Sequence, residues 1–219
     1  MKSAVFTVTI AALIAGLFPA VTGCGGSDGE EPLPSVTETP GNGQGLPTAP
    51  PDGEQPTTGP GEDWEPDGVL GDNEYLGEVQ YRDYELRWAT DGEYVYFGIR
   101  VKTDGWVALG LNPSSRMKDA DMIVGAVDGG QVIISDEFST GTIGPHRADT
   151  ELGGTDDITK YGGSEQGGYT IIEFSRRLDT SDSYDSPLAP GTVTIIWAYG
   201  TSDDTGRQHS SRGTGEITL

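Results

Sequence analysis

The feature that most constrains the fold is a strict two-residue period over the eight residues Tyr94 to Val101 (YVYFGIRV). One face of this stretch would carry Val95, Phe97, Ile99 and Val101. Successive side chains of a β-strand point to opposite faces, so the period predicts a strand with one apolar face. The Asp91-Gly92 pair before it is a strong hairpin-turn signal, and Tyr84 to Thr90 supplies the partner strand. A hairpin of this kind needs a second layer to cover its apolar face.

Short apolar runs separated by turn-forming residues recur along the rest of the chain. The further strand candidates are Trp106–Leu111, Met122–Val127, Gln131–Ser135, Tyr169–Ser175, Thr192–Tyr199 and Glu216–Leu219. Residues 139–168 and 201–212 are polar and predict loops, while Thr192–Tyr199 is the most apolar run and predicts a central strand. No helical period persists for three turns after the N-terminal segment. About nine short strands without alternating helices predict an all-β antiparallel sandwich.

The N-terminus predicts an export signal. Lys2 supplies a positive start, and Ala4 to Val21 supply an apolar stretch that ends in small residues. The sequence Val21-Thr22-Gly23-Cys24 resembles a bacterial lipobox, which implies that residues 1–23 are removed and that Cys24 is lipidated. The protein would then be exported and held at a membrane of the bacterial cell envelope by acyl chains. The alternative is an ordinary secretory signal in which Cys24 is incidental.

Residues 24–63 predict a disordered tether between this anchor and the domain. After Cys24 the segment has no Lys or Arg, and it contains eight prolines among Gly, Thr, Glu and Asp. A segment of this composition cannot bury enough apolar area to offset the entropy lost on ordering. The composition changes at Trp64, so the folded domain is predicted over residues 64–219.

Composition excludes several classes of partner and cofactor. The formal charge of -22 disfavours nucleic acid. A single cysteine excludes an intrachain disulfide and a thiolate metal cluster, and the absence of a CxxCH motif excludes c-type haem attachment. The acidic pairs Asp119/Asp121 and Asp203/Asp204 could offer oxygen ligands to calcium. Neither pair fits an EF-hand pattern, so solvated acidic loops are the simpler interpretation.

The residues able to perform metal or acid–base chemistry are few. Beyond the signal there are two methionines, Met117 and Met122, and two histidines, His146 and His209. No GxSxG motif supports a serine hydrolase, and two histidines without cysteine make a weak zinc set. Met117 and His209 each lie in a polar loop beside an apolar strand. Thioether sulfur and imidazole nitrogen together are known axial ligands of electron-transfer haem.

Six segments, in this order, resemble the DOMON family, whose members include cytochrome-type electron carriers such as the haem domain of cellobiose dehydrogenase. These segments are YELRWATDGEYVYFGIRV, GWVALGLNPSSRMKDADMIVG, SDEFSTGTIGPHRAD, FSRRLDTSDSYDSPL, VTIIWAYG and HSSRGTG, within about residues 75–219. The resemblance implies an immunoglobulin-like β-sandwich. It also implies noncovalent b-type haem with Met117 and His209 as axial ligands, because these residues stand at the family's ligand positions.

Three further residues are candidates for the same site. Trp106 and Trp197 could line a flat apolar pocket for a porphyrin, although both could equally be ordinary core residues. Arg212 could meet a haem propionate, or it could be a surface arginine. Met122 is expected in the core of a strand, and His146 lies outside the segments that carry the ligand positions. Neither is expected to bind iron.

The function expected from these features is one-electron transfer to a redox partner protein rather than enzymatic turnover. Two protein ligands on the iron would leave no position for a substrate. A haem-free DOMON module that binds a carbohydrate or another small ligand is the alternative from a different class. A purely structural interaction domain is the third. Haem colour in the purified protein would separate the first hypothesis from the other two.

Overall fold

A computed structural model describes residues 59–60 and 64–219 of the chain. The predicted signal, the lipidation site Cys24 and nearly all of the predicted tether lie outside these described residues. Within them, no helix is long and apolar enough to cross a membrane.

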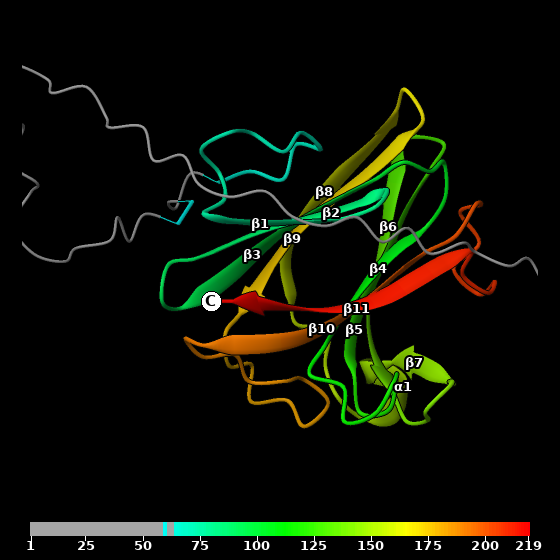
Figure 1. Cartoon of the computed structure of the whole chain (residues 1–219). Helices are drawn as coiled ribbons and strands as arrows, with labels where there is room; N and C mark the ends of the chain where they lie inside the picture. The colour runs from blue at the N-terminus through cyan, green and yellow to red at the C-terminus, as the bar shows by residue number, and fades with distance from the viewer. Residues whose placement is uncertain (1–58, 61–63) are drawn as a thin grey trace, which may run out of the picture. The chain divides into compact units, whose positions relative to one another are not determined.

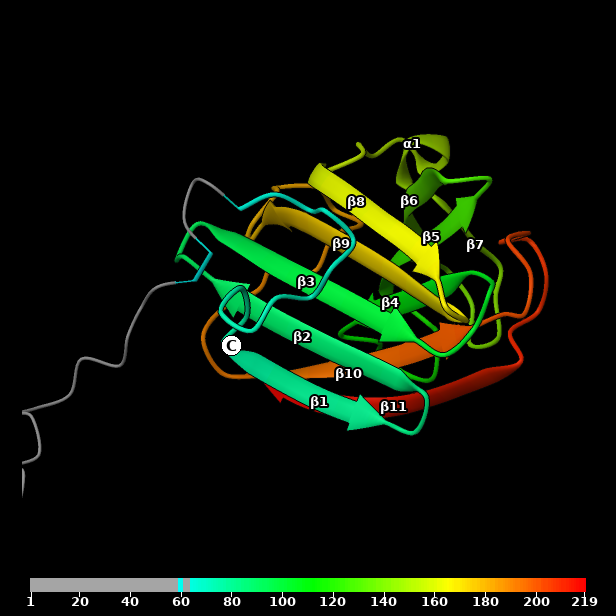
Figure 2. The ribbon, with the colours of Figure 1, turned by 90° about the horizontal axis from the view of Figure 1, so that it is seen from above.

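Two antiparallel sheets form the domain (Figure 1). One sheet has the order β1 (Gly77–Tyr81), β2 (Tyr84–Thr90), β3 (Tyr94–Val101), β9 (Tyr169–Arg177) and β8 (Ile158–Gln166). The other has the order β11 (Ser211–Thr218), β10 (Thr192–Tyr199), β4 (Val107–Leu111), β5 (Asp121–Asp128), β6 (Gln131–Ser139) and β7 (His146–Ala148). One short helix, α1 (Asp149–Leu152), follows β7. Figure 2 shows the two sheets face to face, and the predicted β-sandwich is therefore confirmed.

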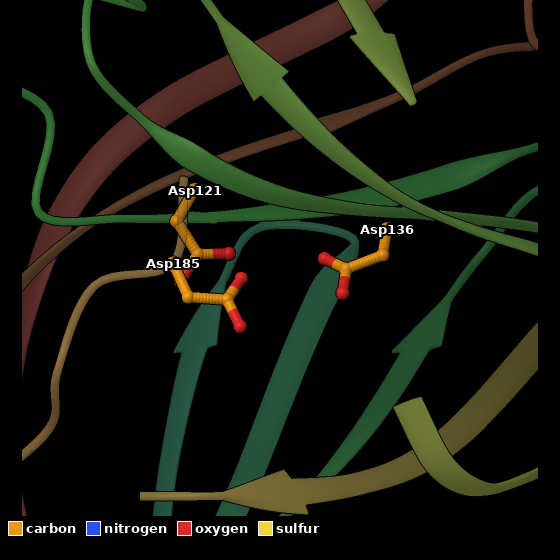
Figure 3. A group of neighbouring side chains, drawn as sticks. All are labelled: Asp121, Asp136 and Asp185. Atoms are coloured by element: carbon orange, nitrogen blue, oxygen red, sulfur yellow. The ribbon is translucent and has the colours of Figure 1, made fainter. Parts of the chain in front are cut away.

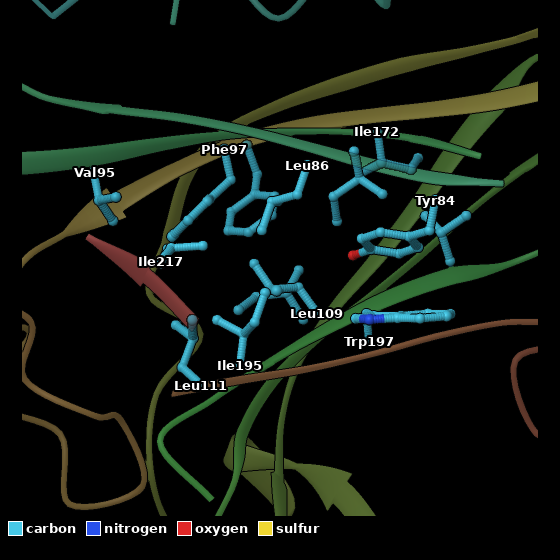
Figure 4. Packing of buried hydrophobic residues seen from close by; sticks show 14 of the residues in the cluster. Tyr84, Leu86, Val95, Phe97, Leu109, Leu111, Ile172, Ile195, Trp197 and Ile217 are labelled. Atoms are coloured by element: carbon cyan, nitrogen blue, oxygen red, sulfur yellow. The ribbon is translucent and has the colours of Figure 1, made fainter. Parts of the chain in front are cut away.

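The main core fills the space between the sheets (Figure 4). The apolar face predicted for β3 is inside it, since Val95, Phe97, Ile99 and Val101 are at most 1% exposed. Phe97 packs on Phe174 of β9, with ring centroids 5.3 Å apart. Across the sandwich, the Tyr84 and Trp197 rings stack at 5.2 Å, and the Tyr84 hydroxyl donates to the Ala108 carbonyl at 3.0 Å. Each such side chain contributes roughly 1.5–3 kcal/mol by leaving water.

Strands β4 and β5 are buried on both faces, which an ordinary two-layer sandwich does not require. Alternate residues of β4 face the main core, whereas Trp106, Ala108, Val124 and Ala126 form a second apolar cluster on the outer face of the six-stranded sheet. Ala198 of β10 packs against that cluster. The outer face of this strand pair is the one that becomes available to a site.

Several elements differ from the prediction. β1, β7, β8 and α1 were not predicted, and the last strand begins at Ser211 rather than Glu216. β8 (ITKYGGSEQ) is the last strand of its sheet's order, so one edge needs no partner strand. Its two glycines admit other backbone, since a Cβ on Gly162 would collide with the Pro66 carbonyl and one on Gly163 with the Ile171 carbonyl. β10 lies between β11 and β4, so it is an interior strand but is not at the centre of its sheet.

The segment that begins at Trp64 lies against the outer face of the five-stranded sheet. It explains why residues on that face, such as Tyr96 and Glu173, are buried. Trp64 is 5% exposed and meets Tyr96 edge to face at 5.1 Å. Glu173 of β9 accepts hydrogen bonds from the Gly68 amide at 2.6 Å and the Tyr75 hydroxyl at 2.7 Å. Burial raises the pKa of Glu173 to about 7. The segment from Trp64 therefore packs on the folded domain, and the described residues 59–60, which belong to the predicted tether, are buried as well.

A candidate ligand cavity on the outer face of the six-stranded sheet

A cavity of about 910 Å³ lies over the outer face of β10, β4 and β5. Its floor consists of small or apolar side chains, namely Ala108, Gly110, Val124, Ile196 and Ala198. Its walls are three loops, which contribute residues 116–117, 142–146 and 205–209. A flat apolar floor with a few polar groups at the rim is the usual construction of a cofactor or small-molecule site, and the volume is near the upper end of that range.

The loop that carries Met117 is held in one conformation by its own backbone. The Ser114 amide donates to the Lys118 carbonyl at 2.8 Å, and the Ala120 amide donates to the Met117 carbonyl at 3.1 Å. The Asp119 amide donates to the Ser139 carbonyl of β6 at 2.8 Å. Arg116, just before Met117, has a positive φ of 54°, which tightens the turn. Met117 is half-buried and lines the cavity, so a flexible thioether is presented on a well-ordered loop.

His209 lines the same cavity from the loop between β10 and β11. The Ser210 amide next to it donates to the Tyr199 carbonyl at 2.8 Å, which closes this loop onto the end of β10. Arg212 Nη1 lies 3.1 Å from His209 Nε2, and because arginine only donates, Nε2 accepts. Burial, and then the Arg212 charge, lowers the pKa of His209 below its ordinary value. The imidazole is therefore neutral at pH 7, which is the form that binds metals.

His146 and Met122 also line this cavity, and sequence reasoning did not find that. His146 Nδ1 is hydrogen-bonded to Glu137 Oε2, and this contact raises the pKa of His146. Met122 is 6% exposed, so its predicted burial is confirmed. It lies outside both apolar clusters, however, and faces the cavity beside Gly110. The residue types alone did not indicate that Met122 and His146 line a cavity. A strand over Met122–Val127 predicts which of its residues share a face, but not what that face contacts.

The remaining candidate residues occupy different surroundings. Trp106 is 6% exposed, lines the cavity and packs on Gly200, where a Cβ would come within 2.3 Å of its indole nitrogen. Trp197 also borders the cavity, but its ring belongs to the main core, stacked on Tyr84. Arg212 is exposed at the cavity rim. The structure thus places all five predicted site residues around one cavity, with Trp197 serving mainly as a core residue.

Comparison with known proteins identifies the family. The sequence model of the DOMON domain family matches residues 80–200, more than half of the chain. This chain therefore belongs to the DOMON domain family. The match includes most of the strands that form the cavity floor. The predicted family membership is therefore confirmed.

Relatives of known name match part of this chain. DBH-like monooxygenase protein 1 is 36% identical over 143 residues in Mus musculus and 34% identical over 142 residues in Homo sapiens. Each match covers 62% of this chain and 22% of the relative. MOXD1 homolog 1 of Drosophila melanogaster is 28% identical over 122 residues, covering 55% of this chain and 18% of the relative. This chain thus spans about a fifth of the length of these relatives.

Among solved structures, the fold resembles the cytochrome b domain of pyranose dehydrogenase from Coprinopsis cinerea. The TM-score is 0.50 with 17% sequence identity, covering 64% of this chain and 80% of that one. At this identity the likeness establishes a shared fold. Any shared cofactor has to be argued from the cavity itself.

Proposed function

We propose that this chain is an exported b-type haem-binding domain that passes single electrons to a partner protein, with Met117 and His209 as the axial ligands. The observation that carries the proposal is that a thioether and a neutral imidazole, from two loops far apart in sequence, line one cavity above a flat apolar floor. Iron in haem is a good acceptor for this pair of ligands.

The residues of the cavity fit such a group in three respects. The floor of alanine, glycine, valine and isoleucine is apolar, as the face of a macrocycle requires, and the volume of about 910 Å³ is ample for a large cofactor. The indole Nε1 of Trp106, on the cavity face of the sheet, is buried and has no hydrogen-bond partner within the described residues. Arg212, exposed at the rim, offers a guanidinium to a carboxylate. A bound haem would supply one-electron redox chemistry, and two protein ligands would leave no position for a substrate.

We prefer His209 over His146 as the iron ligand for two reasons: its imidazole is neutral, and its contact with Arg212 is easily broken. The lowered pKa of His209 keeps a lone pair available, whereas the contact with Glu137 favours the protonated form of His146. Arg212, which contacts His209 Nε2, is exposed and can leave at low cost. His146 is nevertheless the alternative nitrogen ligand in the same cavity, since a histidine oriented through Nδ1 by a carboxylate is a common metal-ligand arrangement.

A carbohydrate-binding function has less support from the cavity. Sugar sites present exposed aromatic faces, but Trp106 and Trp197 are only 6% and 7% exposed. The word monooxygenase in the relatives' names describes proteins about five times longer than the shared region. One-electron transfer therefore remains the function that the cavity supports best.

The proposal includes export and lipid attachment at Cys24, which would hold the domain at a membrane of the bacterial cell envelope. Cys24→Ser is expected to leave the protein unprocessed or to release it from the membrane fraction. Mass spectrometry of the mature N-terminus is the measurement, and a soluble wild-type protein without acyl modification would contradict the anchor. Haem binding by the domain is independent of this outcome.

The test of haem binding is the absorbance spectrum of the full chain produced with a haem supply. The wild type should show the sharp reduced-state bands of six-coordinate, low-spin b-type haem. His209→Ala should lose most of the haem, and Met117→Leu should lose the six-coordinate spectrum. His146→Ala and Met122→Leu are matched controls from the same cavity and should keep the spectrum. A wild type that binds no haem would refute the function, and loss of the spectrum only in the two controls would reverse the ligand assignment.

A further inference from the structure

Four aspartates meet in the interior at one end of the sandwich, away from the ligand cavity. They are Asp121 at the start of β5, Asp136 on β6, Asp149 at the start of α1 and Asp185 in the loop after β9, and they are 0%, 3%, 1% and 7% exposed. Oxygen atoms of Asp121, Asp136 and Asp185 all lie within 4.8 Å of one another. In Figure 3 these three carboxylates are turned toward a common space. The expectation that Asp121 belongs to a solvated acidic loop is therefore wrong.

Among the described residues, the protein groups in contact with this acid cluster (Asp121, Asp136, Asp149 and Asp185) do not balance its charge. Arg176 of β9, fully buried, lies with Nη2 2.6 Å from Asp121 Oδ2 and with Nη1 3.2 Å from Asp185 Oδ2. It supplies one positive charge against four carboxylates. Uncompensated buried charge is among the costliest features a fold can contain, so a further positive charge or bound protons must be present.

In Asp121 and in Asp136, one carboxylate oxygen accepts hydrogen bonds and the second oxygen has no hydrogen-bond partner within the described residues. Asp121 Oδ2 accepts from Arg176 and from the Ser186 amide at 2.9 Å, while Asp136 Oδ2 accepts from the Asp157 amide at 2.9 Å. Asp121 Oδ1, Asp136 Oδ1 and Asp185 Oδ1 have no hydrogen-bond partner within the described residues, and Asp185 Oδ2 has only its ion pair with Arg176. Contacts that orient a carboxylate while leaving one oxygen unused are typical of metal ligands.

Asp149 provides an independent sign of a missing partner. It is not among the three acids within 4.8 Å, yet it is 1% exposed and neither of its oxygens has a hydrogen-bond partner in the described part of the chain. A carboxylate buried with both oxygens unpaired needs a positive partner or a bound proton.

We infer that these four aspartates form a divalent-cation site whose oxygen ligands favour calcium. Hard carboxylate oxygens without nitrogen or sulfur select calcium, magnesium or manganese over transition metals of softer preference. A spread of up to 4.8 Å between ligand atoms fits opposite ligands of calcium, whose bonds are about 2.3–2.6 Å long. Magnesium retains several waters, which a buried set of acids accommodates poorly.

The ion would connect parts of the chain that are distant in sequence. Asp121 and Asp136 come from neighbouring strands, Asp149 comes from α1, and Asp185 comes from the connection between β9 and β10. Arg176 links this group to the other sheet. Calcium would therefore join both sheets and the long connection at one end of the sandwich, and it would act on stability rather than on the cavity.

The test is calcium titration of the full chain after removal of metal with a chelator, by calorimetry and by thermal unfolding at constant ionic strength. At a hundredfold excess over Kd, calcium should raise Tm by about 5–10 °C. Asp136→Asn and Asp149→Asn should abolish this increase. Their metal-free Tm should be no lower than that of the wild type, because each change removes a repelling charge.

Asp128→Asn is the control, since Asp128 lies exposed at the other end of β5. This variant should respond to calcium as the wild type does. Absence of heat and of a Tm shift in the wild type would overturn the site. An equal response in Asp136→Asn would also overturn it, because the effect would then be general screening of an acidic protein. Magnesium acting at an equal or lower concentration than calcium would overturn the assignment to calcium.

Discussion

The ligand cavity and the acid cluster are built from neighbouring residues of the same two strands. Met122 of β5 and Glu137 of β6, which are paired in register, belong to the cavity side, since Met122 lines the cavity and Glu137 holds the cavity-lining His146. Asp121 and Asp136, one residue earlier in each strand, belong to the acid cluster. Successive side chains of a strand point to opposite faces, so a single β-hairpin can serve two sites with opposite requirements.

The difference between the two sites lies in where their polar groups sit. In the cavity, Met117, His146 and His209 are half-buried at the rim above an apolar floor. In the acid cluster, the charged groups are themselves the interior. Changes at the rim should therefore alter ligand binding with little effect on folding, whereas changes in the acid cluster should alter stability. The following predictions test that contrast.

The largest effect is expected at Arg176. Arg176→Met removes the one positive charge that the described part of the chain places in contact with the acid cluster, while keeping much of the side-chain volume. Breaking a buried ion pair from one side typically costs about 3–5 kcal/mol, so the free energy of unfolding should fall by that amount. Urea unfolding in the presence of a chelator is the measurement. A loss below about 1 kcal/mol would show that the four acids are already neutral in the folded protein.

The next effect is expected at His209, where haem affinity should change and stability should not. His209→Ala removes the preferred nitrogen ligand, and haem affinity should fall by a factor of ten or more, corresponding to about 1.4 kcal/mol or more. The free energy of unfolding of the haem-free protein should change by no more than about 0.5 kcal/mol, because the side chain lies at the rim. Haem titration and urea unfolding measure the two quantities. If His209→Ala lowered haem affinity and the free energy of unfolding by equal amounts, the cavity rim would not differ from the acid cluster in its effect on stability.

A third effect concerns the ligand sulfur. Met117→His would keep six-coordinate iron but would replace a soft sulfur with a harder nitrogen. The thioether favours ferrous iron, so the midpoint potential should fall in this variant. Redox titration of the absorbance bands is the measurement, and Met122→Leu is the matched control, with an unchanged potential expected. A change of potential in the control alone would point to Met122 as the sulfur ligand.

A smaller effect is expected at the floor of the cavity. A Cβ on Gly110 would stand 2.6 Å from Ile196 Cγ1, so Gly110→Ala makes the Ile196 side chain shift on the cavity floor, while Met122 Cγ at 3.4 Å remains in ordinary contact. Haem affinity should fall a few-fold, and stability should fall by about 1 kcal/mol. Gly129→Ala is not a suitable comparison because Gly129 has a positive φ of 57°. Ala126→Gly on the same outer cluster is a better one and should cost stability without narrowing the cavity.

The smallest effect is a pH dependence at the cavity rim. The pKa of His146 is raised by its hydrogen bond to Glu137, so the protonated form stabilises the fold. This contribution is fully present below the ordinary pKa of about 6.5 and is lost as pH rises through the higher folded value. His146→Gln should therefore lose at most about 1 kcal/mol near pH 5 and nearly nothing near pH 9. Unfolding at both pH values measures this, and an equal loss at both would contradict the ion-pair role.

Local alternation in the sequence determined most of the sandwich. The runs 84–90, 94–101 and 192–199 are strands with the predicted bounds, because each buries one apolar face and lies between clear turn signals. β8 and β7 were missed because strands near an edge, with glycine and polar residues, leave no such pattern. Their pairing is decided by neighbours that are distant in sequence.

The sequence also determined the family and the chemistry available in the cavity, since its methionines and histidines are few. Only the tertiary structure decided that all four of these side chains surround one cavity, because that depends on which loops meet above the outer sheet face. Only the tertiary structure brought Asp121, Asp136, Asp149 and Asp185 together, over spacings that form no sequence motif. The physical reason is the same in both cases: a strand's period determines which residues share a face, but sheet order and sheet packing determine what that face meets.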